Sequence, residues 1–191
     1  MYKRQEEVNV DVKVDYKDIF SFLIYQNYHS KNGIIAIVLG IFALFSAIYT
    51  FGNVKQSYTM LFSIVAFVML IYEPYALYIK AKNHMKKNAI NNKVWHYSIQ
   101  KKGLLIAIDE KDLKEIEEKE MKEEDKNSHN SANSVFLDWK MVFKIVKTKK
   151  ALYIYTSRIN AHIIPMKYLE SEWESVSKIL YRNVEQFRLK L

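Results

Sequence analysis

Two long apolar stretches constrain what this chain of 191 residues can fold into. Residues 33–51 carry no charge, and residues 58–79 carry only Glu73. At a rise of about 1.5 Å per residue, each stretch would form a helix long enough to cross a hydrocarbon core of about 30 Å, with some end anchoring. Residues 52–57 alone separate the two stretches. The sequence therefore predicts a transmembrane helical hairpin, with the rest of the chain arranged around a bilayer.

The hairpin divides the chain into three regions. We expect an N-terminal strand and amphipathic helix in residues 1–32, the hairpin in residues 33–79, and a globular domain in residues 80–191. The last region is long enough to bury its own core. The first is too short to fold alone, so it should dock on the hairpin or on that domain. Because the first apolar stretch is too long for the core of a signal peptide, we expect the hairpin to be retained.

Lysines are distributed unevenly around the hairpin. The connecting loop has Lys55 alone. The segments before the first stretch and after the second carry more lysines: Lys17, Lys31, Lys80, Lys82, Lys86, Lys87 and Lys93. Positively charged residues favour the cytoplasmic side of a membrane. The distribution predicts a multi-pass protein of the cell membrane with both termini, and the domain in residues 80–191, in the cytoplasm.

Glu73 and Pro74 make the second stretch irregular. An ionisable side chain within a span is by default a candidate ion or proton site. Pro74 would leave the carbonyl of Leu70 without its helical donor and kink the helix. A simpler interpretation is that Glu73 lies near the inner interface, where it reaches the headgroups or pairs with Lys31. A transport role would also require a homo-oligomer, because two helices cannot enclose a pathway.

The charge of the chain indicates a lipid surface as its electrostatic partner. The net charge is +8, but residues 109–126 alone contribute −5, so the remainder carries +13. Beside a bilayer, such a basic remainder is explained more simply by anionic lipid headgroups than by nucleic acid, and we expect no nucleic-acid partner. The candidate lipid contacts are Lys80, Lys82, Lys86, Lys87, Lys147, Lys149 and Lys150.

The sequence contains no motif that indicates catalysis. Cysteine is absent, which excludes disulfides, thiolate nucleophiles and cysteine metal sites. There is no HExxH, P-loop, Rossmann or GxSxG pattern. The five histidines lie far apart in the sequence: His29, His84, His96, His129 and His162. We therefore expect no enzyme, no cofactor and no metal site.

Alternating apolar residues predict several short strands. Val8, Val10, Val12 and Val14 alternate with polar residues, and helical spacing follows from Asp15 to Tyr28. Further strands are predicted at residues 95–99, 104–108, 135–139, 140–147, 152–155 and 161–164. Strands of this length, joined by short turns, predict a small, strongly bent antiparallel sheet. The fold class is therefore α+β, joined to a membrane hairpin.

The end of the chain predicts a helix that covers this sheet. Ser171 and Glu174 have the spacing of a capping box. An apolar stripe follows at Leu169, Trp173, Val176, Leu180, Val184, Phe187 and Leu191. Such a stripe is typical of a helix packed on a sheet, although the spacing also suits a coiled coil. Between two strands, residues 109–134 form an acidic insertion, which we expect to be a solvated helix followed by a flexible linker.

These pieces resemble one family. The segments that carry the resemblance are Leu137-Asp138-Trp139, the tyrosine-rich residues 152–157, and residues 161–169 with their Ile-Ile-Pro stretch. With the preceding hairpin, they are similar to the YcxB-like membrane proteins of bacteria. The resemblance implies a pleckstrin-homology (PH)-like sheet capped by a helix on the cytoplasmic side of a two-span anchor. It implies no established activity. This chain departs from the pattern at Met166, where a basic residue is usual, and in its acidic insertion.

Three hypotheses for function follow. The first is a non-enzymatic interaction module, in which the hairpin holds a PH-like domain at the inner leaflet to bind an unidentified protein partner and anionic lipid. Lys147, Lys149 and Lys150 would then form a headgroup-binding patch, rather than an ordinary solvated turn. The alternative is a small membrane immunity protein that protects against a bacteriocin or toxin. The third is an ion or proton path at Glu73.

Overall fold

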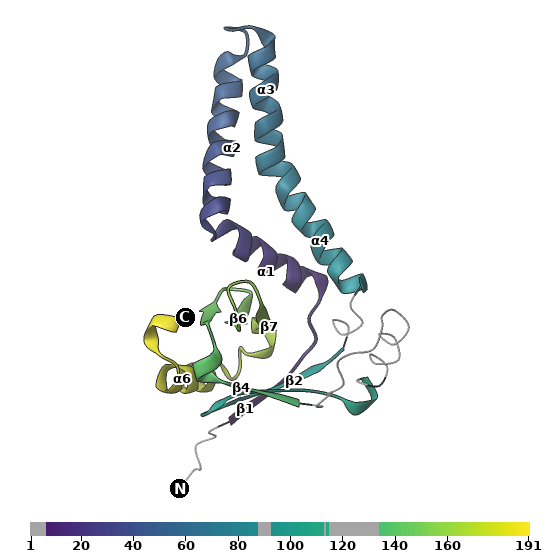
Figure 1. Ribbon diagram of the computed structural model, residues 1–191, viewed down its shortest axis with the longest axis vertical. Helices are drawn as coiled ribbons and strands as arrows, with labels where there is room; N and C mark the ends of the chain where they lie inside the picture. The colour runs from purple at the N-terminus through teal and green to yellow at the C-terminus, as the bar shows by residue number, and fades with distance from the viewer. Residues whose placement is uncertain (1–6, 88–92, 113, 115–133) are drawn as a thin grey trace. The chain divides into compact units, whose positions relative to one another are not determined.

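The computed structural model describes residues 7–87, 93–112, 114 and 134–191. It divides into two compact units (Figure 1). The sheet unit comprises residues 1–18 and 85–191, and the hairpin unit comprises residues 19–84. The N-terminal strand therefore belongs to the same unit as the C-terminal region. Of the acidic insertion, residues 115–133 lie outside the described residues, and with them most of its predicted helix and linker.

The sheet unit contains two four-stranded sheets, where the sequence predicted one bent sheet. The first has the order β1-β2-β3-β4 and is antiparallel throughout: β1 (Glu7–Val12), β2 (Trp95–Gln100), β3 (Gly103–Ile108) and β4 (Ser134–Asp138). The second has the order β7-β6-β5-β8: β5 (Lys144–Lys147), β6 (Ala151–Tyr155), β7 (Ala161–Pro165) and β8 (Leu189–Lys190). In the second sheet β8 runs parallel to β5, and the other pairs are antiparallel.

Strand β1 confirms the alternation seen in the sequence. Val8, Val10 and Val12 are buried, whereas Glu7, Asn9 and Asp11 between them are exposed. The strand pairs with β2 along its whole length, from Glu7 opposite Gln100 to Val12 opposite Trp95. The first strand of the chain is thus an edge of the first sheet, and it buries one face as period-two alternation requires.

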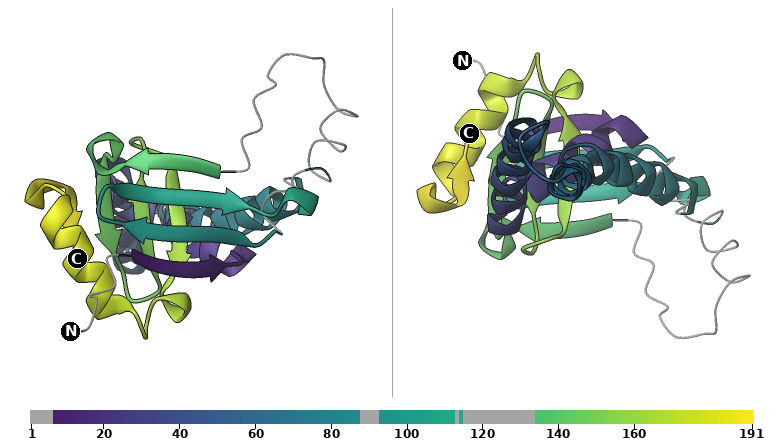
Figure 2. Two further views of the ribbon diagram at one scale, coloured as in Figure 1. Left: turned by 90° about the horizontal axis from the view of Figure 1, so that it is seen from below. Right: turned by 90° about the horizontal axis from the view of Figure 1, so that it is seen from above.

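One apolar core joins both sheets to helix α6 (Trp173–Asn183). Its fully buried members include Val12, Ile99, Leu104, Ile145, Leu152, Ile154, Ile164, Leu169, Val176 and Leu180. Figure 2 shows the strands of the first sheet side by side in front of the second, with α6 at one end of the sheets. Trp139 is buried at this core and donates its Nε1–H to the carbonyl oxygen of Gln100 at 2.9 Å. It is a core anchor, as expected of a tryptophan that can satisfy its only donor.

Two local predictions were wrong. Residues 140–147 are not one strand, because a 3-10 helix (Trp139–Met141) precedes β5. The Asp138 side chain caps this turn by accepting from the Lys140 N–H at 2.8 Å, and Met141 is exposed as a result. A capped turn competes with strand formation at this point.

The C-terminal helix is also shorter than predicted. It begins at Trp173 with Glu172 as the N-cap, without a side-chain cap bond, so the Ser171–Glu174 capping box does not form. It ends at Asn183, and Phe187 lies in a further 3-10 helix (Gln186–Arg188) that leads into β8. Leu189 and Lys190 form β8 and pair with β5, so they do not continue the helix.

The hairpin unit is helical and contains two apolar helices. Its elements are α1 (Tyr16–Tyr28), α2 (Lys31–Thr50), α3 (Gln56–Phe67), a π-helical segment (Val68–Tyr72) and α4 (Glu73–Lys87). The helices Lys31–Thr50 and Gln56–Lys86 are long and apolar enough to cross a membrane. They correspond to the predicted spans 33–51 and 58–79. The second helix extends further than its span because Lys and Asn residues continue it beyond the apolar stretch.

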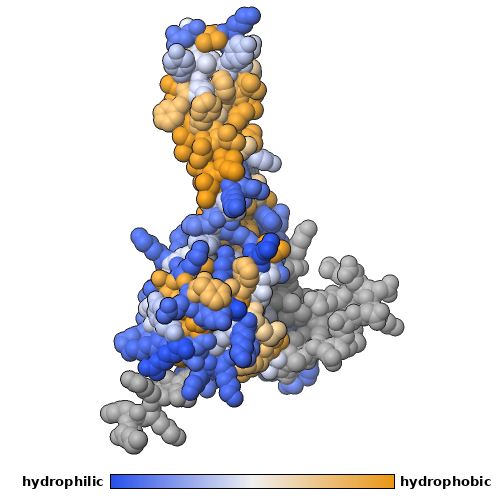
Figure 3. Space-filling model, turned by 60° about the vertical axis from the view of Figure 1, so that its left-hand side comes forward, coloured by the Kyte–Doolittle hydropathy of each residue, from blue (hydrophilic) through white to orange (hydrophobic). Residues whose placement is uncertain are grey.

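Small residues pack α2 against α3. Gly40, Ala43, Ala47 and Thr50 are buried, and Thr59 Oγ1 donates to Thr50 Oγ1 at 3.0 Å. A Cβ atom on Gly40 would lie 2.8 Å from a methyl carbon of Leu70, which explains the glycine. The large apolar side chains of both helices point outward instead, and they form the apolar column in Figure 3. Close approach through small residues is typical of helices that pack in lipid.

Glu73 is the first residue of α4 and directly follows the π-helical segment. The Glu73 N–H bonds to the Val68 carbonyl, which closes a π-turn directly before Pro74. Proline and π-bulges both bend helices. Glu73 Oε1 accepts from Asn27 Nδ2 at 2.8 Å, so Asn27 rather than the predicted Lys31 is its partner. Its Oε2 is buried and has no hydrogen-bond partner among the described residues.

Candidate functional site

The turn between β5 and β6 forms a basic hollow on the sheet unit. We define the basic hollow by its lining residues: Lys147, Thr148, Lys149, Met166 and Glu170. Lys147 is the last residue of β5, whereas Met166 and Glu170 follow β7. The hollow is open to solvent, and it suits a polar group presented at a surface rather than an enclosed small molecule.

Thr148 builds the turn that presents these lysines. Its N–H donates to the Ala151 carbonyl at 2.9 Å, and its Oγ1 accepts from the Ala151 N–H at 3.0 Å. Its Oγ1 also accepts from the Lys150 N–H at 3.3 Å. The Lys150 carbonyl in turn accepts from the Met166 N–H at 2.8 Å. The backbone of the hollow is therefore held by hydrogen bonds on both sides, which reduces the entropy lost on binding.

Lys147 is held in place by an aromatic ring. Its Nζ lies 4.0 Å from the centroid of Trp173, the first residue of α6, in a cation–π contact. Such a contact orients the ammonium without neutralising it. None of the ion pairs among the described residues involves Lys147, Lys149 or Lys150. Glu170 is the acidic member of the hollow, so its net charge remains positive.

The structure brings together part of the predicted lysine set. Lys147 and Lys149 line the basic hollow, and Lys150 is exposed on the same turn. Lys80, Lys82 and Lys86 are exposed along the later turns of α4. Lys87 is the last residue of α4, and its side chain lies outside the described part of the chain.

The sequence did not single out Trp173, Thr148 or Glu170 as members of this site. Trp173 was assigned only to the apolar stripe, yet one face of its ring contacts a lysine from a distant strand. The signal that could have indicated the site is Met166, the position that departs from the family pattern. It forms a buried wall of the hollow, so the chain lacks a positive charge there.

A second polar cluster crosses strands β1 and β2. His96 Nδ1 lies 2.6 Å from Asp11 Oδ1, and Nε2 lies 3.4 Å from Asp109 Oδ1, without hydrogen-bond geometry. The hydrogen bond to Asp11 raises the pKa of His96 above its usual value, against the opposing effect of partial burial. Among the described residues, no three His, Asp or Glu side chains are grouped to hold a metal ion. The cluster is a cross-strand ion pair.

The sheet unit is an α+β domain of two mainly antiparallel sheets and a C-terminal helix, with a basic hollow at one turn. Residues 128–180 match the family model described as YcxB-like protein. This match confirms the resemblance predicted from the sequence. The matched segment contains β4 to β7 and the first part of α6, and therefore all residues of the basic hollow. Among curated proteins and among solved structures, none matches this chain.

Proposed function

We propose that this protein is a membrane-anchored, non-enzymatic interaction module whose basic hollow binds the phosphate of an anionic lipid headgroup. The observation that carries the proposal is the hydrogen-bonded turn that presents Lys147 and Lys149 around an open hollow. Each lysine close to an anionic membrane surface contributes about 1 kcal/mol to binding. In this proposal the sheet unit is a PH-like domain, which agrees with its two sheets and its C-terminal helix.

The outward-facing apolar side chains of α2 and α3 support a membrane hairpin. In water, an exposed apolar surface that continues along two helices would be strongly unfavourable. In hydrocarbon the same surface is solvated, and the small residues between the helices allow close packing. The hairpin is then a two-span anchor of the cell membrane.

The charges at the ends of the hairpin support the proposed orientation. Lys31 begins α2, and Lys80 and Lys82 lie on α4, whereas Lys55 is the cation before α3. By the positive-inside rule, the loop lies outside and both termini lie in the cytoplasm. Four lysines would then lie near the inner leaflet and strengthen the attraction of the protein to anionic lipid headgroups: Lys80, Lys82, Lys86 and Lys87.

Headgroup binding can be tested with the full-length protein in nanodiscs of phosphatidylcholine, with or without phosphatidylglycerol. Hydrogen–deuterium exchange of the turn at Lys147–Lys150 should slow when the anionic lipid is present. Replacing Lys147, Lys149 and Lys150 with Gln should remove this protection. The matched control replaces Lys13, Lys101 and Lys102, which are exposed elsewhere on the sheet unit, and should retain it. Equal exchange in both lipids for the unaltered protein would contradict the proposal.

The proposed protein partner requires a separate experiment. Crosslinking in the native membrane, followed by purification of the tagged full-length chain and mass spectrometry, should recover one stoichiometric partner. Recovery of the protein alone, or with lipid alone, would reduce the function to lipid binding.

A further inference from the structure

Three large apolar side chains are exposed at one end of the second sheet. Met141, Phe143 and Phe187 are 69%, 48% and 79% exposed. Met141 and Phe143 precede β5, and Phe187 precedes β8. Because β5 and β8 are parallel, with Ile145 opposite Leu189, Phe143 and Phe187 come to the same end of the sheet. We call these three side chains the apolar patch.

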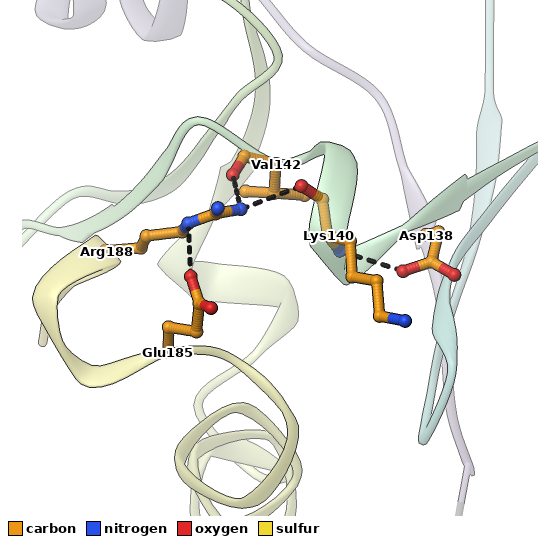
Figure 4. A network of polar contacts seen from close by, with 5 residues as sticks. All are labelled: Asp138, Lys140, Val142, Glu185 and Arg188. Carbon is orange, nitrogen blue, oxygen red and sulfur yellow. Dashed lines mark hydrogen bonds and ion pairs between the residues drawn. The ribbon is translucent and has the colours of Figure 1, made fainter.

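Arg188 fixes the two segments that carry the apolar patch (Figure 4). Its Nη1 donates to the carbonyl oxygens of Lys140 at 2.8 Å and Val142 at 2.9 Å. Its Nε pairs with Glu185 at 2.9 Å, and Asp138 caps the adjoining turn through the Lys140 N–H. The patch is therefore presented on a braced backbone, so its exposure is a property of the folded domain.

Four cationic residues neighbour the apolar patch in the chain or in the sheet: Lys140, Lys144, Arg188 and Lys190. Partial burial and, to a smaller extent, the positive charge of Lys190 lower the pKa of Lys144. Lys144 lies 4.2 Å from the Tyr155 ring centroid rather than on a carboxylate. The acids among the described neighbours, Asp138 and Glu185, are engaged in the cap and the Arg188 pair.

We propose that the apolar patch inserts into the interfacial layer of an anionic bilayer, with Lys140, Lys144 and Lys190 on lipid phosphates. Apolar side chains surrounded by lysine and arginine are typical of surfaces that lie in this layer. A second copy of the chain would bring the same cations face to face, whereas anionic lipid is complementary to them. The inference rests on the proposed function, because it adds a second contact to the membrane that the basic hollow would bind.

The absence of cysteine allows a direct test of insertion on the full-length chain. Single variants Met141→Cys and Phe187→Cys would carry an environment-sensitive fluorophore, in nanodiscs of phosphatidylcholine and phosphatidylglycerol. Lipids with a doxyl quencher near the headgroup should quench both labels several-fold more than a label at Asn9→Cys, because Asn9 is exposed on β1 of the first sheet. Equal quenching at all three positions, or none at positions 141 and 187, would overturn the inference.

Two further readouts separate the alternatives. Hydrogen–deuterium exchange at Lys147–Lys150 reports the basic hollow independently of the patch. If anionic lipid did not slow this exchange but still quenched the labels at positions 141 and 187, the proposed function alone would be refuted. If anionic lipid slowed the exchange but did not quench the labels, insertion of the apolar patch alone would be refuted. Energy transfer between labelled copies, without quenching by lipid, would also overturn the inference and make the patch a contact between two chains. Replacing Phe187 with Ser should reduce quenching at position 141, whereas Asn9→Ser on β1 should not change it.

Discussion

The hairpin unit exposes its large apolar side chains, whereas the sheet unit buries most of them in its core. In the hairpin, Phe42 is 64% exposed while Gly40 and Ala43 are buried. In the sheet unit, Leu152 and Ile154 are fully buried, and the polar residues of β1 point outward. The sheet unit follows the rule for a domain in water, where burial of apolar side chains is favourable. The difference supports the proposed membrane hairpin, because an apolar surface exposed along two long helices is favourable in hydrocarbon and unfavourable in water.

The largest expected effect is the loss of a core side chain from the sheet unit. Leu152→Ala should lower the free energy of unfolding by about 2–5 kcal/mol, because it leaves a cavity where both sheets meet. Thermal unfolding followed by circular dichroism would measure it. The control Ile159→Ala removes an exposed side chain and should change stability by less than about 0.5 kcal/mol. If both variants behaved alike, the sheet unit would not have the core described.

A charge on the exposed apolar face of the hairpin tests whether this face contacts hydrocarbon. Phe42→Asp should cost about 3 kcal/mol of membrane insertion, because an aspartate near the centre of a span must leave water. Extraction of membranes at high pH would measure the fraction retained, with Phe42→Leu as the conservative control. Unchanged retention of the aspartate variant would mean that this face does not contact hydrocarbon.

Overpacking the hairpin should have a moderate effect. Gly40→Leu would collide with Leu70 and Met69 of the π-helical segment and should destabilise the packing of α2 on the second apolar helix, Gln56–Lys86, by about 1–3 kcal/mol. Cysteines at Thr50 and Thr59, whose hydroxyl oxygens are 3.0 Å apart, would report the contact by disulfide yield. The yield should fall in Gly40→Leu and persist in Ile41→Leu, since Ile41 is exposed. A constant yield would show that α2 and the second apolar helix do not pack through Gly40.

The smallest expected effect is a pH dependence of the sheet unit. Since Asp11 raises the folded-state pKa of His96, the pair should stabilise the fold fully below the ordinary histidine pKa of 6.5. This contribution should be lost as the pH rises through the raised value. It should stay below about 1 kcal/mol because the pair is largely exposed and screened. Asp11→Asn should flatten the pH profile of thermal unfolding above and below pH 6.5, and an unchanged profile would rule out this pair as its source.

Much of the fold could be predicted from periodicity. The alternation at Val8, Val10 and Val12 indicated a half-buried strand, and the two apolar stretches indicated the two long helices. The turn at Lys149 was also predicted, because polar residues separate two apolar runs there. These features depend on neighbours in the sequence, whose spacing alone decides which side chains share a face.

Other features depended on contacts between distant residues. The Arg188 bonds to Lys140 and Val142 join segments far apart in the chain, and β8 pairs with β5 where a continued helix was predicted. Asn27 rather than Lys31 binds Glu73, although both lie close in sequence to the start of α2. No local pattern encodes such choices.

The sequence by itself determined which segments form long apolar helices and which form strands, because hydrophobic length and period decide which side chains share a face. It also determined the candidate lysines and the resemblance that the family match confirms. The tertiary structure alone decided that there are two sheets, that Trp173 lies beneath Lys147, and that Met141, Phe143 and Phe187 remain exposed. The physical reason is that burial and ring contacts depend on which distant segments meet in the fold, and the spacing of residues along the chain does not specify those contacts.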